Sequence, residues 1–359
     1  MNILVPGKAS IIIGGQWGSC GKGAVAAWFA AKHALRGEVF SIHTTNAGAQ
    51  AGHTSIHRHT SIHNYIKRVA FHLPTASLIA QSYGFDYVTT YLNAGSIIDA
   101  DVLEQELVGF NPSKLFIHPN AAVIWQSHRD HEGGANSSTT RIASTRKGVG
   151  AALADKLMRR GNIAANDPYL TRFTRRLDLN QSLADSKSVL VEVPQGVGLS
   201  LNGSFYPYCT SRDCTVMQAL SDAGIHPSFL GPVVLVLRTY PIRVGNITDD
   251  MGREIGHSGG CYEDQLEITW EDIGVEPEYT TVTKRKRRIF TFSEQQAREA
   301  MSLSRPDVVV LTFCNYIAER RGVEDLAEIV KCIGRDIGKV PEILYEYGPT
   351  TEDIFTEPK

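Results

Sequence analysis

The chain has 359 residues, of which 42% are apolar and 21% charged, the composition of a soluble globular protein. Its formal charge of −2 excludes a general affinity for nucleic acid or membranes, so any anion site must be local. No apolar run approaches the roughly 20 residues of a membrane span, and the N-terminus lacks the basic and then apolar pattern of a signal peptide. We therefore expect a cytoplasmic protein that binds neither nucleic acid nor membranes.

The stretch with the clearest chemistry is residues 10–29, SIIIGGQWGSCGKGAVAAWF. Its three isoleucines predict a buried strand, and the Ala-rich residues 24–34 predict a helix. Lys22 stands where this helix begins, and a helix N-terminus beside a lysine is a ready phosphate site. The alternative, glycines that serve packing alone, is the weaker interpretation of a short stretch with this set: Gly14, Gly15, Gly18, Gly21 and Gly23.

These residues do not form an ordinary Walker A loop, because Gly23 replaces the Ser or Thr that would hold magnesium. The string GGQWGSCGKG resembles instead the opening loop of the adenylosuccinate synthetases. That family joins aspartate to C6 of a purine nucleotide with a nucleoside triphosphate. The resemblance implies that Gly18, Gly21, Lys22 and Gly23 bind the donor nucleotide and that Lys22 serves phosphoryl transfer. Ser19 stands where the family has its catalytic aspartate, beside the substrate base and magnesium.

A second predicted strand, residues 39–43, leads into a loop rich in Gly, Ala and Asn. Residues 51–54, AGHT, resemble the family's Asn-Ala-Gly-His-Thr signature. The resemblance implies that His53 is an acid beside the β–γ bridge of the donor and that Thr54 adjoins the donor. It also implies that the Gly52 carbonyl helps to bind Mg²⁺ and that Gln50 lies near the edge of the substrate purine.

Four further histidines raise a metal site as an alternative: His57, His59, His63 and His72. They alternate with polar residues and lack the acidic or cysteine ligands of a convincing site, so we interpret them as surface or sheet residues. The six cysteines are scattered without a CxxC pair, which indicates reduced thiols rather than disulfides or zinc.

The rest of the chain alternates apolar runs with polar loops. We expect short strands at residues 69–73, 77–80, 115–118 and 121–125, a helix over 101–109, and a mobile loop over 133–138. Longer apolar runs predict buried strands at residues 188–193, 233–237 and 307–312.

Three segments resemble the family's site for the substrate nucleotide. Residues 144–150, STRKGVG, resemble its Thr-Thr-Gly-Arg-Gly-Ile-Gly loop, which implies that Thr145, with Ser144 beside it, binds the 5′-phosphate. Residues 206–211, YPYCTS, closely match its Tyr-Pro-Tyr-Val-Thr-Ser string and imply a second phosphate ligand, Thr210. Hydroxyls suit this task because they donate to oxyanions without a buried charge. Arg243 begins an Arg-Val-Gly turn like the one beside the sugar.

The strand predicted at residues 188–193 runs on to a Gln-Gly pair. Open α/β sheets place ligand contacts at the carboxyl ends of their strands. In the family this glutamine contacts the substrate base, so the resemblance gives Gln195 that role in binding and catalysis.

Residues 155–161, DKLMRRG, resemble a helix end whose first arginine enters the partner subunit's site. The resemblance implies a homodimer in which Arg159 contacts the substrate phosphate in trans. The alternative is a solvated cationic helix C-terminus, which the helix dipole favours.

Residues 283–288, TKRKRR, would by themselves indicate a nucleic-acid patch or a solvated charge run. They resemble the family's loop that closes over aspartate, which implies that Thr283, Arg285 and Arg287 bind that substrate. The planar fork of arginine suits a carboxylate because it donates two parallel hydrogen bonds. The nearly neutral chain argues against nucleic acid.

The strand at residues 307–312 leads into Phe313 and Asn315, where the family has a lysine that packs on guanine and an aspartate that reads it. An amide both donates and accepts, which suits the amino group and ring nitrogen of adenine. The donor is therefore expected to be ATP or dATP rather than GTP. Gly348 and Pro349 resemble the pair that lines the same base pocket. The alternative is that Asn315 only caps the helix that follows.

Taken together, the motifs predict an α/β fold around a mostly parallel central sheet with a P-loop-like phosphate loop, as a single domain over residues 1–359 with loop excursions. The departures at Ser19, Phe313 and Asn315 look like the viral branch of the family, which makes 2-amino-2′-deoxyadenylosuccinate. That branch condenses dGMP with L-aspartate, using ATP or dATP and Mg²⁺, through a 6-phosphoryl intermediate in the infected cell's cytoplasm. Two alternatives stay open: an ordinary adenylosuccinate synthetase acting on IMP, and a nucleotide-binding regulator without catalysis.

Overall fold

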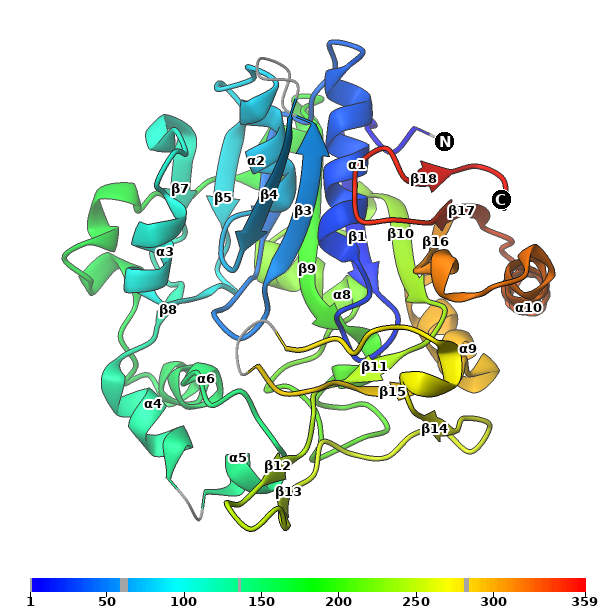
Figure 1. Cartoon of the computed structure of the whole chain (residues 1–359). Coiled ribbons are helices and arrows are strands. Elements are labelled where there is room, and N and C mark those ends of the chain that lie inside the picture. The colour runs from blue at the N-terminus through cyan, green and yellow to red at the C-terminus, as the bar shows by residue number, and fades with distance from the viewer. Residues whose placement is uncertain (1, 59–63, 135–136, 281–283) are drawn as a thin grey trace.

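The computed structural model describes residues 2–58, 64–134, 137–280 and 284–359. Its centre is a nine-stranded sheet (Figure 1). Its strands are, in chain order, β1 (Ala9–Gly14), β2 (Ile42–Thr45), β5 (Thr89–Leu92), β7 (Leu115–Ile117), β9 (Val189–Gly196), β10 (Leu230–Arg238), β16 (Val308–Thr312), β17 (Glu342–Glu346) and β18 (Ile354–Phe355). Across the sheet they follow the order β18-β17-β16-β10-β1-β9-β2-β5-β7, and every neighbouring pair is parallel except β17 and β18. The predicted fold class is confirmed.

Smaller sheets and helices complete the chain. The small sheets pair β3 (His53–Arg58) with β4 (Tyr65–Ala70), β6 (Ile97–Ile98) with β8 (Ala122–Val123), β12 (Ile247–Thr248) with β13 (Glu254–Gly256), and β15 (Arg288–Phe290) with both β11 (Ile242–Arg243) and β14 (Glu267–Ile268). The α-helices are α1 (Lys22–Ala34), α2 (Thr75–Ser82), α3 (Ala100–Glu106), α4 (Gln126–Gly133), α5 (Ser138–Arg141), α6 (Val149–Leu157), α7 (Leu179–Ala184), α8 (Val216–Ala223), α9 (Glu294–Ser304) and α10 (Arg320–Asp336).

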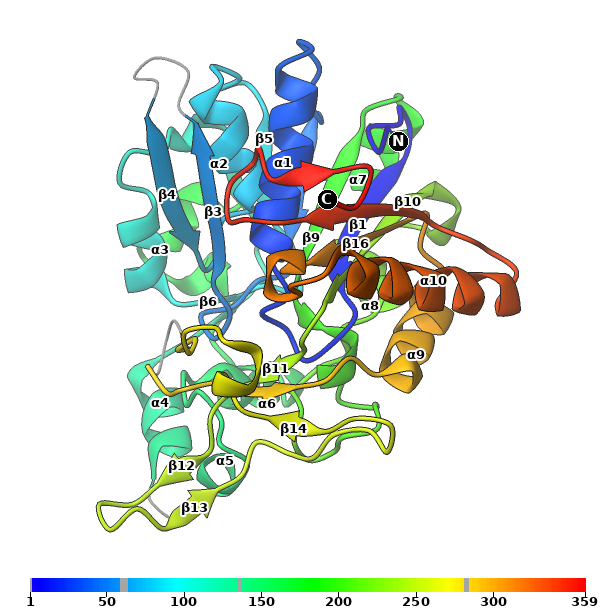
Figure 2. The same cartoon turned by 45° about the vertical axis from the view of Figure 1, so that its right-hand side comes forward.

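Helices cover both faces of the central sheet, so its strands are apolar on both sides. In β1, Ile12 packs in a cluster with Val25 and Phe29 of α1. Ile11 and Ile13 point the other way, into a cluster built with α8, α9 and α10. Figure 2 shows α1 and α2 on one side of the sheet and α9 and α10 on the other.

The parallel arrangement explains how distant motifs come together. Parallel neighbours end at the same edge of a sheet, where open α/β folds bind their ligands. The segments that follow β1, β2, β9, β10, β16 and β17 therefore meet at the carboxyl edge. They include the glycine-rich loop, the AGHT signature, the Gln-Gly pair, the Arg-Val-Gly turn, Phe313 with Asn315, and the Gly-Pro pair.

One strand prediction is wrong, because residues 77–80 lie within α2. Ala76 and Ile79 recur at helical spacing and pack in the same cluster as α1. The buried carboxylate of Glu192 accepts hydrogen bonds from the N–H groups of Thr75 and Ala76. The Glu192 carboxylate thus caps α2 from a distant part of the chain, and the local sequence does not predict this helix.

Other predicted boundaries shift by a few residues. β2 begins at Ile42 rather than at residue 39, and β4 ends at Ala70. The predicted loop over residues 133–138 begins at the last residue of α4 and ends at the first of α5, and residues 135–136 lie outside the described part.

The prediction that these histidines are surface or sheet residues holds for His57 but not for His72. His57 is buried in β3, as expected of a sheet residue. His72 is buried outside the strands, where its Nε2 accepts from Asp99 N at 3.1 Å and its Nδ1 lies 3.3 Å from Glu106 Oε2. His59 and His63 lie outside the described residues. The described residues include no group of three or more His, Cys, Asp or Glu placed to hold a metal ion, and the six cysteines are free thiols.

In the part of the chain that the structure describes, no helix has both the length and the apolar character of a membrane span.

Candidate active site

The carboxyl edge encloses a cavity of about 950 Å³, at the upper end of the range for ligand sites. Arg159 and Arg285 do not line it, and Thr283 lies outside the described residues. The other predicted site residues are brought together in its wall: Gly18, Ser19, Gly21, Lys22, Gly23, Gln50, Gly52, His53, Thr54, Ser144, Thr145, Gln195, Thr210, Arg243, Arg287, Asn315, Gly348 and Pro349.

The glycine-rich loop delivers Lys22 to the start of α1. Gly21 caps this helix with φ 83°, a left-handed conformation that favours glycine. Gly23 is needed for a different reason: a Cβ there would stand 2.5 Å from the carbonyl oxygen of Thr54. The buried Lys22 ammonium donates a hydrogen bond to the carbonyl of Gln195. A cation beside a helix N-terminus without a side-chain cap is an arrangement that attracts phosphate.

Four cavity residues other than glycine also hold a left-handed backbone: Ser19 at φ 49°, Ala143 at φ 51°, Gln195 at φ 62° and Phe313 at φ 59°. Each such residue costs on the order of 1–3 kcal/mol and persists only where its surroundings fix it. Three of the four, Ser19, Gln195 and Phe313, stand where the family contacts the substrate base or the donor base. Most of the backbone strain in the cavity wall therefore lies at positions that the family resemblance assigns to contacts with the two bases.

His53 is oriented by a buried carboxylate. Its Nδ1 lies 3.4 Å from Glu192 Oε2, and the same carboxylate accepts from Thr75 N at 3.0 Å and Ala76 N at 2.7 Å. Glu192 is thus fixed by the start of α2. The other ring nitrogen of His53, Nε2, is buried and has no hydrogen-bond partner among the described residues. Because His53 lines the cavity, this nitrogen is available to a ligand there.

Gln50 offers a second unsatisfied group. Both its amide atoms, Nε2 and Oε1, are buried without a hydrogen-bond partner in the described structure. An unpaired buried polar group costs about 1–3 kcal/mol. A purine edge, which carries donors and acceptors side by side, would satisfy both atoms.

At the predicted phosphate wall, the N-terminus of the adjoining helix, α6, is not free to bind an anion. α6 begins after Gly148, but Glu132 accepts from Gly148 N at 2.7 Å and from Gly150 N at 2.8 Å. A protein carboxylate therefore occupies the positive end of this helix. Thr145 and Thr210, the predicted phosphate ligands, line the same wall.

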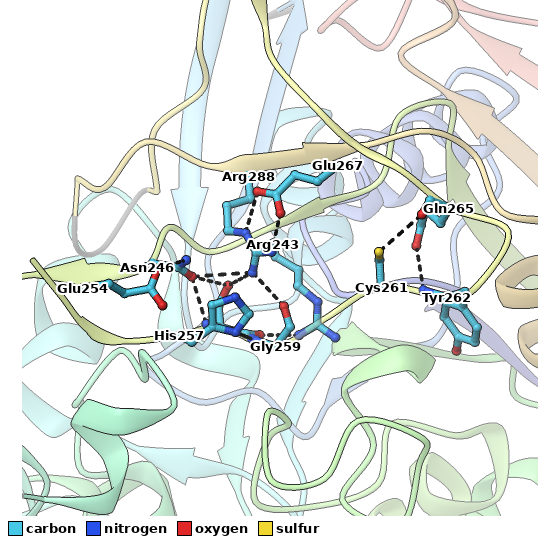
Figure 3. A network of polar contacts seen from close by, with 11 residues as sticks. Arg243, Asn246, Glu254, His257, Gly259, Cys261, Tyr262, Gln265, Glu267 and Arg288 are labelled. Carbon is cyan, nitrogen blue, oxygen red and sulfur yellow. Dashed lines mark hydrogen bonds and ion pairs between the residues drawn. The ribbon is translucent and has the colours of Figure 1, made fainter.

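Arg243 is held by the network of Figure 3. Its Nη1 donates to the carbonyl of Ser258, and its guanidinium carbon lies 4.2 Å from the centre of the Trp17 ring. Arg288 braces the same turn, with Nη1 on Ser258 Oγ at 2.9 Å and Nη2 on Glu267 at 2.5 Å. Burial, and then the charge of Arg288, lowers the pKa of Arg243 to about 9. The buried Nε and Nη2 of Arg243 have no partner among the described residues, so they can bind a ligand.

The two arginines of the predicted aspartate loop differ. Arg287 lines the cavity, and no hydrogen bond joins its guanidinium to a described residue. Burial lowers its pKa to about 10, with Glu278 acting in the opposite direction. Arg285 instead donates to the carbonyls of Gly245 and Ala143, both at 2.9 Å. Arg287 thus lines the cavity without a hydrogen bond from its guanidinium to a described residue, whereas Arg285 ties its segment to the wall.

The predicted donor pocket contains a stacked pair. The guanidinium carbon of Arg238 lies 3.6 Å from the centre of the Phe313 ring. Arg238 is fully buried, is paired with Glu278 and donates to Ser19 O at 3.3 Å. Tyr316 donates to Glu278 at 2.8 Å. The ring that would floor the donor base is therefore held by a residue that also holds the glycine-rich loop.

Among the charged residues in and around the cavity that no sequence motif includes are Glu192, Arg238 and Glu346, all of them buried. Arg238 and Glu346 are the last residues of β10 and β17, and Glu192 lies in the middle of β9, each next to apolar residues of its strand. Charged residues are almost never fully buried unless they are paired. This position within an apolar run is the signal that would have found them.

The chain can now be compared with known proteins. The family described as adenylosuccinate synthetase matches residues 11–178 and 166–324. The N6-succino-2-amino-2′-deoxyadenylate synthase of Salmonella phage PMBT28 is 36% identical over 377 residues, covering 97% of each chain. The chain belongs to the adenylosuccinate synthetase family. The predicted family is confirmed.

Two further proteins are similar to this chain over nearly its whole length. The adenylosuccinate synthetase of Pyrococcus horikoshii is 29% identical over 361 residues, which are 96% of this chain and 97% of that one. The solved succinoaminodeoxyadenylate synthetase of cyanophage S-2L, bound to dGMP and dATP as an energy donor, matches with a TM-score of 0.82 at 33% identity. The match covers 98% of this chain and 96% of that one.

Proposed function

We propose that this enzyme condenses L-aspartate with dGMP at C6 of the purine, driven by ATP or dATP. The products are 2-amino-2′-deoxy-N6-succinyladenylate, ADP or dADP, and phosphate. The observation that carries the proposal is that the departures from the family pattern, Ser19, Phe313 and Asn315, line one cavity with the retained motifs. The names of the phage relatives and the nucleotides bound by the cyanophage enzyme support it.

The proposed reaction has two steps. O6 of the guanine takes the γ-phosphoryl group of the donor, and the amine of aspartate then adds to C6 as the C6–O bond breaks and phosphate leaves. Lys22 neutralises charge on the phosphoryl group, and His53 Nε2 supplies a proton at the oxygen between the β- and γ-phosphates. Gln50 and Gln195 hold the base, while Arg287 holds the aspartate carboxylate.

Magnesium fits this donor set. The Ser19 hydroxyl and the Gly52 carbonyl line the cavity and would hold the ion as neutral oxygen ligands. Mg²⁺ in such sites takes one or two protein oxygens and completes its shell with water and substrate phosphates. The described residues contain no acidic cluster that would bind it alone. When bound, the ion neutralises charge on the donor phosphates.

The test is a panel of dGMP, GMP and IMP, each with ATP, dATP and GTP, followed by phosphate release with and without aspartate. We expect aspartate-dependent release with dGMP and an adenine nucleotide. A preference for IMP would identify an ordinary adenylosuccinate synthetase, the activity that names the Pyrococcus relative. Phosphate release that never depends on aspartate would leave a nucleotide-binding regulator.

Ser19 is expected to make room for the 2-amino group rather than to act as the base. Serine is shorter than aspartate and uncharged, so it leaves space beside N1 of guanine, whereas an added carboxylate would crowd a packed site. Ser19→Asp should reduce dGMP turnover and favour hypoxanthine nucleotides. Ser19→Ala should keep substantial dGMP activity, because water can take the place of the hydroxyl in the shell of Mg²⁺. Steady-state kinetics with dGMP and IMP check both. If Ser19→Ala abolished catalysis with dGMP binding intact, serine would have a direct chemical role.

Arg287→Ala is expected to raise the KM for aspartate far more than the KM for either nucleotide. Loss of a charge-assisted contact costs about 1.5–3 kcal/mol, or roughly 10- to 150-fold. Arg287→Lys should fail as well, because one ammonium cannot reproduce a bidentate fork. The matched control is Lys286→Ala, on the same segment but exposed. Unchanged aspartate kinetics in Arg287→Ala would remove this residue from the aspartate site.

A further inference from the structure

The donor pocket contains a buried carboxylate that the sequence motifs do not include. Glu346 is the last residue of β17, two residues before Gly348, and only 4% of its surface is exposed. It lines the cavity with Phe313, Asn315 and Pro349. A buried acid in a ligand cavity requires hydrogen-bond donors.

The protein supplies a donor to one oxygen of this carboxylate. Phe313 N donates to Glu346 Oε2 at 3.0 Å. No donor among the described residues reaches Oε1. The nearby cation, Arg238, is paired with Glu278. Burial, opposed by the Phe313 N–H and Arg238, raises the pKa of Glu346 to about 7. The absence of a donor at Oε1 among the described residues indicates that a ligand N–H would complete the environment of this oxygen.

We propose that Glu346 Oε1 recognises the exocyclic 6-amino group of the donor purine and acts with Asn315 to select adenine nucleotides. The inference rests on the proposed function and assigns a specificity-determining residue within it. A carboxylate oxygen accepts from the 6-amino group of adenine and repels the 6-oxo group of guanine. The Asn315 amide is then left for the adjacent ring nitrogen.

The alternative use of a carboxylate, reading guanine by its N1–H and 2-amino groups, needs two free oxygens side by side. Among the described residues only Oε1 of Glu346 lacks a donor, because Oε2 already accepts from Phe313 N. The ring of Phe313 is in turn fixed on Arg238, so the backbone N–H that occupies Oε2 is fixed as well. The geometry therefore favours a single contact with one amino group.

The experiment compares ATP with purine riboside triphosphate, which lacks only the 6-amino group, in the dGMP and aspartate reaction. The wild-type enzyme should prefer ATP by roughly 10- to 100-fold in kcat/KM, the effect of one buried hydrogen bond. In Glu346→Gln one amide oxygen can still accept from Phe313 N, which turns the amide NH2 toward the ligand. This variant should lose most of the preference for ATP over the analogue and should use GTP better.

The ratio between two donors is measured within one preparation, so a partly folded variant does not bias it. Glu342→Gln, an exposed position on the same strand, should keep the wild-type ratio. Equal losses for ATP and the analogue in Glu346→Gln would overturn the proposal, as would equal use of ATP and GTP by the wild type. If no donor supported aspartate-dependent turnover, the proposed function would fail, and calorimetric binding of ATP against the analogue would still test Glu346.

Discussion

Replacing Glu192 by glutamine should lower kcat by at least about tenfold, with the KM values of all three substrates nearly unchanged. The carboxylate lies 3.4 Å from His53 Nδ1, which leaves Nε2 for the cavity. A glutamine can turn its NH2 toward the imidazole, which would make Nδ1 an acceptor and move the proton to Nε2. The ring would then lose the carboxylate that orients it and balances the charge of the doubly protonated ring, the form that supplies a proton at Nε2.

Steady-state kinetics and a double-mutant cycle check this positioning role. His53→Asn should cost roughly 10²–10⁴ in kcat, the usual contribution of a general acid. The double variant should be no slower than His53→Asn alone, because Glu192 then has no imidazole to orient. Glu192 also caps α2, so the melting temperature of each variant is the structural control. Additive losses in kcat would mean that Glu192 only stabilises the helix. The ¹⁵N shifts of His53 should report the tautomer directly.

The parts of the fold and site that could be predicted depend on local patterns. The run of isoleucines before the glycines gives β1, and the strand–loop–helix arrangement places Lys22 at the start of α1. The Gln-Gly pair is predicted to contact a ligand because open α/β sheets bind ligands at the carboxyl ends of their strands. The structure does bring the AGHT signature, the Gln-Gly pair and the Phe313 segment into one cavity wall.

The parts that could not be predicted depend on contacts between distant residues. α2 starts where Glu192, more than a hundred residues away, accepts from Thr75 and Ala76. Arg285 is assigned to aspartate by its motif, and in the structure it donates to the carbonyl of Ala143 across the site. Glu346 lies at the end of a short C-terminal strand, and its role depends on the N–H of Phe313 on the neighbouring strand. The sequence spacing of these pairs does not predict that their members are in contact.

Arg238 shows why the substitutions in the donor pocket belong together. Its guanidinium stacks on Phe313, pairs with Glu278 and donates to the carbonyl of Ser19. The proposed donor floor, the base of the aspartate loop and the glycine-rich loop thus share one buried cation. A change at residue 313 alone would leave this guanidinium without its ring. The pocket is therefore better understood as a unit than as separate replacements.

The placement of Arg159 leads to the second large expected effect. Arg159 follows α6 with φ 61° and does not line the cavity of its own chain. Its neighbours Leu157 and Met158 are 71% and 65% exposed, as is typical of a surface that a second copy covers. We propose that the enzyme is a two-fold dimer in which each Arg159 reaches the substrate phosphate of the partner's site.

Mixing two inactive variants should then restore activity. Arg159→Leu lacks the phosphate contact, and Lys22→Ala lacks the phosphoryl-transfer cation, so each homodimer is nearly dead. A mixed dimer has one site with Lys22 from one subunit and Arg159 from the other, and one site with neither. After complete exchange of equal amounts, half of the dimers are mixed, and about one quarter of all sites are intact. We expect about that fraction of wild-type phosphate release, with subunit exchange followed by two different tags. Arg160→Leu, one residue along, is the matched control and should stay active without mixing. If exchange were complete and no activity returned, Arg159 would act within its own subunit or not at all, and its exposed position would reflect only a solvated helix end.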